Sequence, residues 1–180
     1  MRILAGKLKY KRINYKKDAN LRPTRNVVRK SFFDTVAPVI KDSVFLDLFA
    51  GVGSMGLEAL SRGAKKAIFV DNSFRSVEII KRNVNEAGCE DNSVVIKKSV
   101  YEFNADPRLK DVNLVYMDAP YEFDINAFLE EFFEYVNPEA IVCVEHASKK
   151  SLGEMFGRFV KFKTRHFGKS SLSYFGVLDE

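Results

Sequence analysis

Short apolar runs alternate along most of the chain with longer stretches in which apolar residues recur at helical spacing. This alternation is typical of a doubly wound α/β domain, in which helices cover both faces of a mostly parallel sheet. The apolar runs predict a seven-stranded sheet. We expect its strands at Val44–Phe49, Ala67–Asp71, Val94–Lys97, Leu114–Asp118, Ile141–Glu145, Phe159–Phe167 and Leu172–Leu178.

The intervening stretches predict the helices and one hairpin. Apolar residues between the second and third strands fall on one helical face until Gly88, which is a suitable stop. Further helices are expected at Asn126–Tyr135 and at Asn26–Val36. The last two strands are separated only by residues 168–171, which leaves no room for a crossover helix. They should therefore form a C-terminal antiparallel hairpin.

The net charge of +5 is distributed unevenly. Residues 1–30 contain eleven Lys or Arg and a single acid, Asp18, so this segment carries about +10, while the rest of the chain is acidic. Tyr10 and Tyr15 lie among these basic residues, a pattern that suits contact with a phosphate backbone. We therefore interpret residues 1–25 as an RNA-contacting arm and residues 26–180 as the catalytic core of a single domain. The alternative is a solvated, disordered basic tail.

Composition excludes several other classes of protein. Cys89 and Cys143 are the two cysteines, and their spacing suggests neither a disulfide framework nor a zinc site. No apolar stretch is long enough for a membrane span, and the first residues lack the apolar run of a secretory signal. We expect a cytoplasmic monomer that needs no metal and no membrane.

The strongest local signal is the segment Phe45–Gly56, in which a strand runs into a glycine-rich turn and then a helix. Gly51 and Gly53 permit positive φ and close backbone approach, and the helix that follows presents unpaired N–H groups to a polar ligand. Asp71, at the end of the next strand, is placed to bind ribose hydroxyls. The segment is therefore a candidate ligand loop.

Two cofactors fit this loop. Gly51–Gly56 matches the GxGxxG fingerprint of dinucleotide sites, with Asp71 twenty positions after its first glycine. S-adenosylmethionine is favoured because Asp47 is placed to receive its ammonium group, and because 180 residues leave no room for the substrate domain that nicotinamide enzymes usually add. Asp47 could instead cap the N–H groups of the loop itself, and Asp71 could be a strand-end cap.

A second motif, Asp118-Ala119-Pro120-Tyr121, follows the fourth strand. An exocyclic base amine is a poor nucleophile because its lone pair is delocalised into the ring. Asp118 and the Ala119 carbonyl could accept its hydrogens, and Tyr121 could stack on the unstacked base. These four residues are our candidate catalytic set, and the chemistry needs no metal. The alternative interpretation of the motif is an ordinary strand-to-loop turn.

Together these segments resemble a known family, the bacterial methyltransferases of the N2 amine of a guanine in 16S ribosomal RNA, named for guanine 966. The resemblance covers nearly the whole chain and rests on Arg2–Lys7, Leu21–Thr24, Val28-Arg29 and Asp47–Ala64. It implies a Rossmann-like class I methyltransferase fold, S-adenosylmethionine as cofactor, and 16S rRNA or a small-subunit particle as partner. The candidate cofactor-binding residues are Asp47, Phe49, Ala50, Gly51, Gly53, Asp71, Asn72 and Ser99; the candidate substrate-binding residues are Arg2, Lys7, Arg22, Thr24, Arg29 and Tyr121.

The chain departs from the family pattern at two places. Ala119 stands where the family usually has a first proline, which keeps the carbonyl but loosens its backbone. Ser99 and Val100 follow the third strand, where related enzymes often carry an acidic or amide residue near the adenine ring.

Two other functions remain open from sequence. Similar motifs serve adenine N6 methyltransferases acting on DNA or RNA, and Ala119 also allows a non-catalytic RNA-binding assembly factor. His146 and His166 lie in or beside late strands without a matching nucleophile, so we expect structural roles for both.

Overall fold

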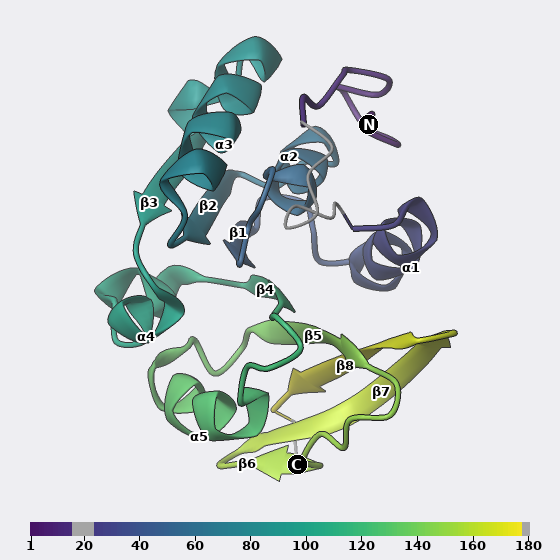
Figure 1. The fold of residues 1–180 in the computed structure, drawn as a ribbon, viewed down its shortest axis with the longest axis vertical. Coiled ribbons are helices and arrows are strands. Elements are labelled where there is room, and N and C mark those ends of the chain that lie inside the picture. The colour runs from purple at the N-terminus through teal and green to yellow at the C-terminus, as the bar shows by residue number, and fades with distance from the viewer. Residues whose placement is uncertain (16–23, 178–180) are drawn as a thin grey trace.

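A computed structural model describes residues 1–15 and 24–177. The expected apolar runs form one mixed sheet whose strands follow the order β3-β2-β1-β4-β5-β8-β7-β6 (Figure 1). Strands β1 to β5 pair in parallel, and β5 to β8 pair antiparallel. The strands are β1 (Val44–Leu48), β2 (Lys66–Asp71), β3 (Ser93–Lys97), β4 (Leu114–Asp118), β5 (Ile141–Ala147), β6 (Met155–Phe156), β7 (Phe159–Phe167) and β8 (Ser170–Gly176).

The sheet has one strand more than the seven expected. Met155 and Phe156 form β6, which pairs with the start of β7 at the sheet edge. Two residues are too few to show as an apolar run, and Met155 is exposed, so the sequence pattern gave no sign of this strand. The other seven strands and the β7–β8 hairpin are confirmed, although Leu178, the expected end of the last strand, lies outside the described residues.

Helices cover both faces of the sheet. Apolar side chains of α1, α2 and α3 pack on one face, and those of α4 and α5 pack on the other. Helix α1 has the bounds that its apolar spacing predicted, and α3 ends at Gly88, whose φ of 67° closes the helix. The α-helices are α1 (Asn26–Val36), α2 (Ser54–Ser61), α3 (Phe74–Ala87), α4 (Val100–Phe103) and α5 (Ile125–Tyr135), with short 3-10 turns at η1 (Glu90–Asn92) and η2 (Pro107–Asp111).

Buried aromatic rings lock each helical layer to the sheet. On one face, Phe32 of α1 packs edge-to-face on Tyr116 of β4, with ring centroids 5.1 Å apart. On the other face, Phe133 of α5 stacks on Phe159 of β7 at 4.3 Å. Burial of each such ring contributes roughly 1.5–3 kcal/mol. The strand ends that carry polar side chains are therefore held on a rigid frame.

The strand order places a crevice between β1 and β4. The chain runs outward from β1 through β2 to β3 and then returns to β4 on the other side of β1. Loops that leave β1 and β4 consequently diverge at the carboxyl edge of the sheet, which is where ligands bind in open α/β folds.

The basic N-terminal segment is folded against this frame. Ile3 and Ile13 are fully buried against α2 and α3. The segment lies beside α2 in Figure 1, and the Lys7 amide donates to the Ser61 carbonyl at 2.8 Å. Gly6 has φ of 84°, and a Cβ there would lie 1.9 Å from the Ser61 carbonyl oxygen, so only glycine permits this approach. Residues 1–15 thus have a packing role in addition to the RNA contact that we expect of them.

Glu58 of α2 is the buried acceptor that holds this segment. Its carboxylate accepts the amides of Leu4 at 2.8 Å and Ala5 at 3.0 Å and the Arg62 Nε at 2.8 Å. The Arg29 Nε of α1 lies 4.0 Å away, and the side chains of Glu58 and Arg29 are both 0% exposed. One carboxylate therefore joins α1, α2 and the N-terminal segment.

Replacing this carboxylate should destabilise the whole domain. Glu58→Ala leaves the Arg29 guanidinium buried without its counter-ion, so we expect the free energy of unfolding to fall by roughly 3–5 kcal/mol in urea denaturation. Glu78→Ala is the control, because Glu78 pairs with Lys81 on the exposed side of α3 and should cost less than about 1 kcal/mol. Equal effects of the two variants would contradict a central role for Glu58.

Candidate functional site

A large cleft lies at the carboxyl edge of the sheet. Its volume of about 1140 Å³ exceeds the roughly 300–1,000 Å³ of pockets that hold one small molecule, so it has room for two ligands side by side. The loops after β1 to β5 line it, together with Thr24, Arg25 and the β7–β8 turn. It brings together Thr24, Phe49, Gly51, Asp71, Asn72, Ser99, Asp118, Ala119, Pro120 and Tyr121 from the expected site residues.

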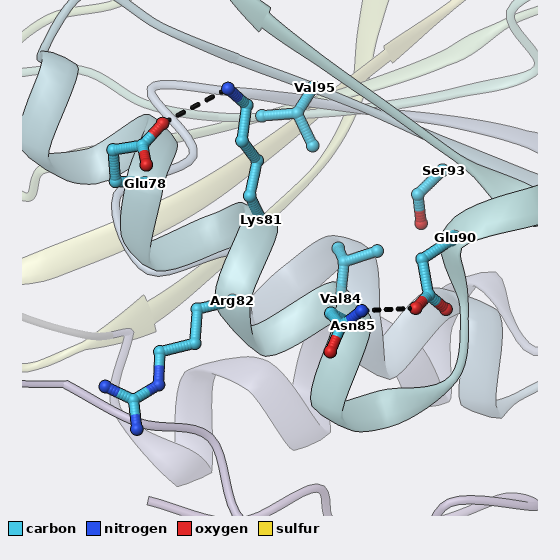
Figure 2. Close-up of a pocket in the computed structure, with 8 residues that line it drawn as sticks. All are labelled: Glu78, Lys81, Arg82, Val84, Asn85, Glu90, Ser93 and Val95. Atoms are coloured by element: carbon cyan, nitrogen blue, oxygen red, sulfur yellow. Dashed lines mark hydrogen bonds and ion pairs between the residues drawn. The ribbon is translucent and has the colours of Figure 1, made fainter.

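A second hollow, of about 530 Å³, lies between α3 and the edge strand β3 (Figure 2). Four of its polar side chains are paired with one another: Lys81 donates to Glu78 at 3.1 Å, and Asn85 donates to Glu90 at 2.8 Å. None of the loops at the carboxyl edge contributes to this hollow. The larger cleft is therefore the candidate site.

The glycine loop is shaped by positive φ angles and by two carboxylates. Gly51 and Gly53 have φ of 57° and 77°, and Phe49 also adopts a positive φ of 61°, which is unusual for an aromatic residue. Asp71 accepts the Gly51 amide at 2.8 Å, and Asp47 accepts a helix amide of α2 at 3.0 Å. Asp71 also accepts the Ser73 amide through its other oxygen. Both oxygens of Asp71 and one oxygen of Asp47 thus act as the backbone caps that the sequence left as an alternative.

Asp47 is buried at the base of a narrow recess that adjoins the cleft. Thr24, Ala50, Met55 and Asp118 also line this recess. Burial raises the pKa of Asp47 well above its usual range, and the charges of Asp71 and Asp118 raise it further, while the hydrogen bond from the Gly56 amide opposes them. A cationic group in the recess would favour the ionised form of Asp47.

Of the other expected cofactor residues, Gly53 and Ser99 have clear structural roles. The Cβ position of Gly53 faces Phe69 and Ile80 at 3.3–3.4 Å, behind the loop. Ser99 caps α4: its hydroxyl accepts the Glu102 amide at 3.2 Å. Ser99 still lines the cleft, with its hydroxyl already engaged in the cap.

Asp118 faces a second carboxylate, which is not among the expected site residues. Glu145 occupies the same register on β5, directly opposite Asp118 on β4. Its Oε2 accepts the Tyr116 hydroxyl at 2.5 Å. Burial raises the pKa of Asp118 to about 7, and the charge of Glu145 raises it as well. The strand expected at Ile141–Glu145 ended on a carboxylate, the same signal as Asp118 at the end of Leu114–Asp118, although β5 itself continues to Ala147.

Aromatic rings form one wall of the cleft. Phe123 packs on Phe49 at 5.1 Å and on Tyr101 at 5.3 Å, and Lys150 donates from its Nζ to the Phe123 carbonyl at 2.5 Å. Tyr121 is 74% exposed at the rim, so its ring is free to meet a ligand. Tyr101, in the four-residue helix α4, was not anticipated because the sequence showed no helix there.

The structure spreads the expected substrate-binding residues over different places. Thr24 lines the cleft, whereas the side chain of Arg29 is fully buried and donates to the Arg2 carbonyl at 2.6 Å. This placement differs from the substrate-binding role expected of Arg29, because its guanidinium compensates Glu58 inside the fold. Arg2 and Lys7 are exposed, and Lys7 lies at the carboxyl end of α2, the edge of the sheet opposite the cleft. Arg22 lies outside the described residues.

The two histidines bind hydroxyls of the C-terminal hairpin. His146 Nε2 lies 2.9 Å from the Ser173 hydroxyl, and His166 Nδ1 lies 2.8 Å from the Ser171 hydroxyl. Residues 1–15 and 24–177 contain no group of three or more His, Cys, Asp or Glu arranged to hold a metal ion. Over the same ranges, no helix is long and apolar enough to cross a membrane.

Known proteins are similar to this chain in sequence and in fold. The family model described as "Conserved hypothetical protein 95" matches residues 1–176. "Ribosomal RNA small subunit methyltransferase D" of Escherichia coli K12 is 32% identical over 160 residues, 84% of this chain and 77% of that protein. The solved structure of "Putative methyltransferase yhhF from Escherichia coli" has a TM-score of 0.87 at 25% identity and covers 100% of this chain and 99% of that one. An RNA methyltransferase of Salinibacter ruber in complex with S-adenosyl-L-homocysteine has a TM-score of 0.69 at 16% identity, covers 88% and 95% of the two chains, and shares the fold.

The raised pKa of Asp118 predicts a dependence of stability on pH. Between about pH 4 and pH 7 the folded protein keeps a proton on this carboxyl that the unfolded chain releases, so the contribution of Asp118 to stability is lost as pH rises through about 7. Asp118→Asn cannot lose this proton. We expect the variant to gain stability over wild type at pH 8, on the order of a few kcal/mol, and little at pH 4.

Urea unfolding at the two pH values measures this difference. Asp34→Asn is the control, since Asp34 is an exposed partner of Lys30 on α1 and should show no such gain. If Asp118→Asn were equally or less stable than wild type at pH 8, Asp118 would not be held in a raised-pKa environment.

Proposed function

The chain belongs to the family described as Conserved hypothetical protein 95, and from this premise we propose that it is an S-adenosylmethionine-dependent methyltransferase acting on the N2 amine of a guanine in 16S ribosomal RNA. The observation that carries the proposal is one cleft that holds both the glycine loop and Asp118-Ala119-Pro120-Tyr121. The relative from Escherichia coli, named for the small-subunit ribosomal RNA, supports the substrate.

The residues of the cleft suit the chemistry of S-adenosylmethionine. Asp71 retains acceptor capacity for ribose hydroxyls beside its two backbone hydrogen bonds. The buried Asp47 carboxylate and the carbonyls of the loop would receive the ammonium group in the recess. Val100 and the rings of Tyr101 and Phe123 offer an apolar surface for a heterocycle. Phe49, Ala50, Gly51 and Asn72 would supply backbone and side-chain contacts along the same path.

Methyl transfer requires the target amine to be stripped of competing interactions and aligned. S-adenosylmethionine supplies a methyl group on a sulfonium sulfur. Transfer of that methyl group to the N2 lone pair would leave the electron pair of the C–S bond on sulfur and one proton to be removed from N2. Asp118 and the Ala119 carbonyl accept the two N2 hydrogens, and Asp118 takes the proton. A carboxyl with a pKa near 7 is matched to this role at neutral pH.

Ala119 keeps the acceptor on which this geometry depends. Its carbonyl is bonded to the ring nitrogen of Pro120, and that proline still restricts the backbone on either side of the peptide bond. Loss of the usual first proline removes one constraint on the backbone at Ala119. It leaves the two acceptors, the Asp118 carboxylate and the Ala119 carbonyl, in place. We propose that activity is retained, and a methyl-transfer assay distinguishes this from an RNA-binding factor without turnover.

The RNA would approach from the rim of the cleft. Tyr121, at the exposed rim, would stack on the flipped base, and Thr24 borders both the recess and the cleft. We retain residues 1–25, with Arg2, Lys7 and Arg22, as the proposed basic arm. Since neither Arg2 nor Lys7 lines the cleft, they would contact phosphates other than those beside the target base.

Methyl transfer to small ribosomal subunits from a strain lacking this modification tests the reaction. Wild type should transfer labelled methyl to give N2-methylguanosine, with a rate that rises between pH 6 and pH 8 as Asp118 ionises. Asp118→Ala should lower the rate of methyl transfer about 100-fold or more. Appearance of N6-methyladenosine would show that the methylated base is adenine and would overturn the guanine proposal. Cofactor binding without transfer to any nucleic acid would favour the assembly-factor alternative.

A basic residue at the rim should contribute to RNA affinity through a phosphate contact. Lys169 lies exposed in the β7–β8 turn and lines the cleft. Lys169→Ala should weaken RNA binding and reduce the slope of log affinity against log salt by about one. Lys110→Ala removes the same charge from η2, which precedes β4 at the opposite edge of the sheet, and should change neither quantity. Equal losses in the two variants, measured by titration at several salt concentrations, would argue against docking at the rim.

A further inference from the structure

Glu145 is a cleft residue to which the chemistry above gives no role. It lies directly opposite Asp118 in adjacent parallel strands, which are about 4.8 Å apart, and both line the cleft. Tyr116, two residues before Asp118 on the same strand face, is fully buried and donates its hydroxyl to Glu145 Oε2. This hydrogen bond fixes one oxygen of the carboxylate. The other remains available to a ligand in the cleft.

Two ionised carboxylates side by side repel each other unless hydrogen-bond donors or a positive charge lie next to them. The described residues provide Glu145 with the Tyr116 hydroxyl and no cationic partner within ion-pair distance. A ligand edge that offers two adjacent N–H groups would relieve this repulsion and satisfy both acceptors. A ligand with an acceptor at either point would increase it.

Guanine and adenine differ in this respect. On its Watson–Crick edge guanine presents the N1–H and the N2 amine, which are neighbouring donors, whereas adenine presents an unprotonated N1 beside its N6 amine. Enzymes that act on flipped bases read this edge by hydrogen bonds. The carboxylate pair is complementary to guanine and opposed to adenine.

We propose that Glu145 is the specificity-determining residue of the cleft: it accepts the N1–H of the target guanine while Asp118 accepts a hydrogen of N2. This proposal rests on the proposed function, since it requires a base amine at Asp118. Tyr116 is a positioning residue, which acts by orienting the Glu145 carboxylate. Buried groups built to pair with a specific donor reject bases that lack it, because the acceptor is then left unpaired.

The analogue 2-aminopurine tests this arrangement, because it keeps the reactive amine at the same position and has an unprotonated N1. Small subunits are reconstituted with 16S rRNA carrying either guanine or 2-aminopurine at the nucleotide that the methyl-transfer assay identifies. Wild type should methylate 2-aminopurine with a kcat/KM about 10- to 100-fold lower than guanine, the value of a hydrogen bond to a charged acceptor.

Glu145→Gln should reverse this preference in a defined way. Its amide oxygen can keep the Tyr116 hydrogen bond, and its NH₂ then faces the base. That donor opposes guanine N1–H and binds the N1 of 2-aminopurine, so the guanine to 2-aminopurine ratio should fall toward one or below. Tyr116→Phe, which leaves the charge and loosens its position, should lower the ratio partway. Glu122→Gln, at an exposed glutamate next to Tyr121, should leave the ratio unchanged.

The outcomes separate the two proposals. If wild type methylates guanine and Glu145→Gln lowers kcat/KM equally for guanine and for 2-aminopurine, Glu145 does not read N1. This inference then fails, while the methyltransferase function stands. If wild type methylates no guanine, the proposed function fails and takes this inference with it. Unchanged cofactor binding by Glu145→Gln, measured by calorimetry with S-adenosylhomocysteine, shows that the variant is folded.

Discussion

Hydrogen bonds from the glycine loop to two strand-end carboxylates are the interaction on which the site depends. Asp47 and Asp71 come from adjacent strands, and each accepts a backbone N–H of the loop or of the helix that follows it. These bonds hold three residues of the loop at positive φ, including Phe49, whose ring then reaches Phe123. The register of the strands therefore determines the shape of the loop, and the loop in turn positions the aromatic wall of the cleft. A change in either carboxylate would alter the recess and the aromatic wall together.

The same arrangement gathers acids where burial penalises their charge. Asp47, Asp118 and Glu145 lie on one face of three strands, and burial raises the pKa of the two aspartates. A core of apolar residues at these positions would be more stable. A ligand that brings hydrogen-bond donors or positive charge offsets the penalty of burying these carboxylates. The proposed cationic cofactor and the donor edge of the proposed base would both do so. Strain and acidity thus concentrate at the carboxyl edge, while the aromatic layers beneath supply stability.

Much of this could be predicted from sequence because it depends on periodicity. Strand positions, the bounds of α1, and the placement of Asp71 and Asp118 at strand ends follow from apolar runs and from the topology of parallel sheets. Roles that depend on tertiary contacts could not be obtained this way. Arg29 looks like any surface arginine on a helix until Glu58 is seen facing it inside the fold. Glu145 carried a visible signal at the end of the expected strand Ile141–Glu145, but its meaning depended on the register that sets it opposite Asp118.

The N-terminal segment combines a feature that is visible in the sequence, its charge, with one that only the tertiary structure shows, its packing. Its composition indicates a partner with phosphates, yet its first fifteen residues are held by Glu58, Ser61 and Asn83 on the helical face of the core. The chain then leads to Thr24, which borders both the recess and the open cleft. Charge and packing are therefore combined in one segment, so that any surface it offers to RNA is fixed relative to the site by the same contacts that stabilise α2. The proposed arm, anchored in this way, would orient its partner, which a flexible tail of equal charge would not do.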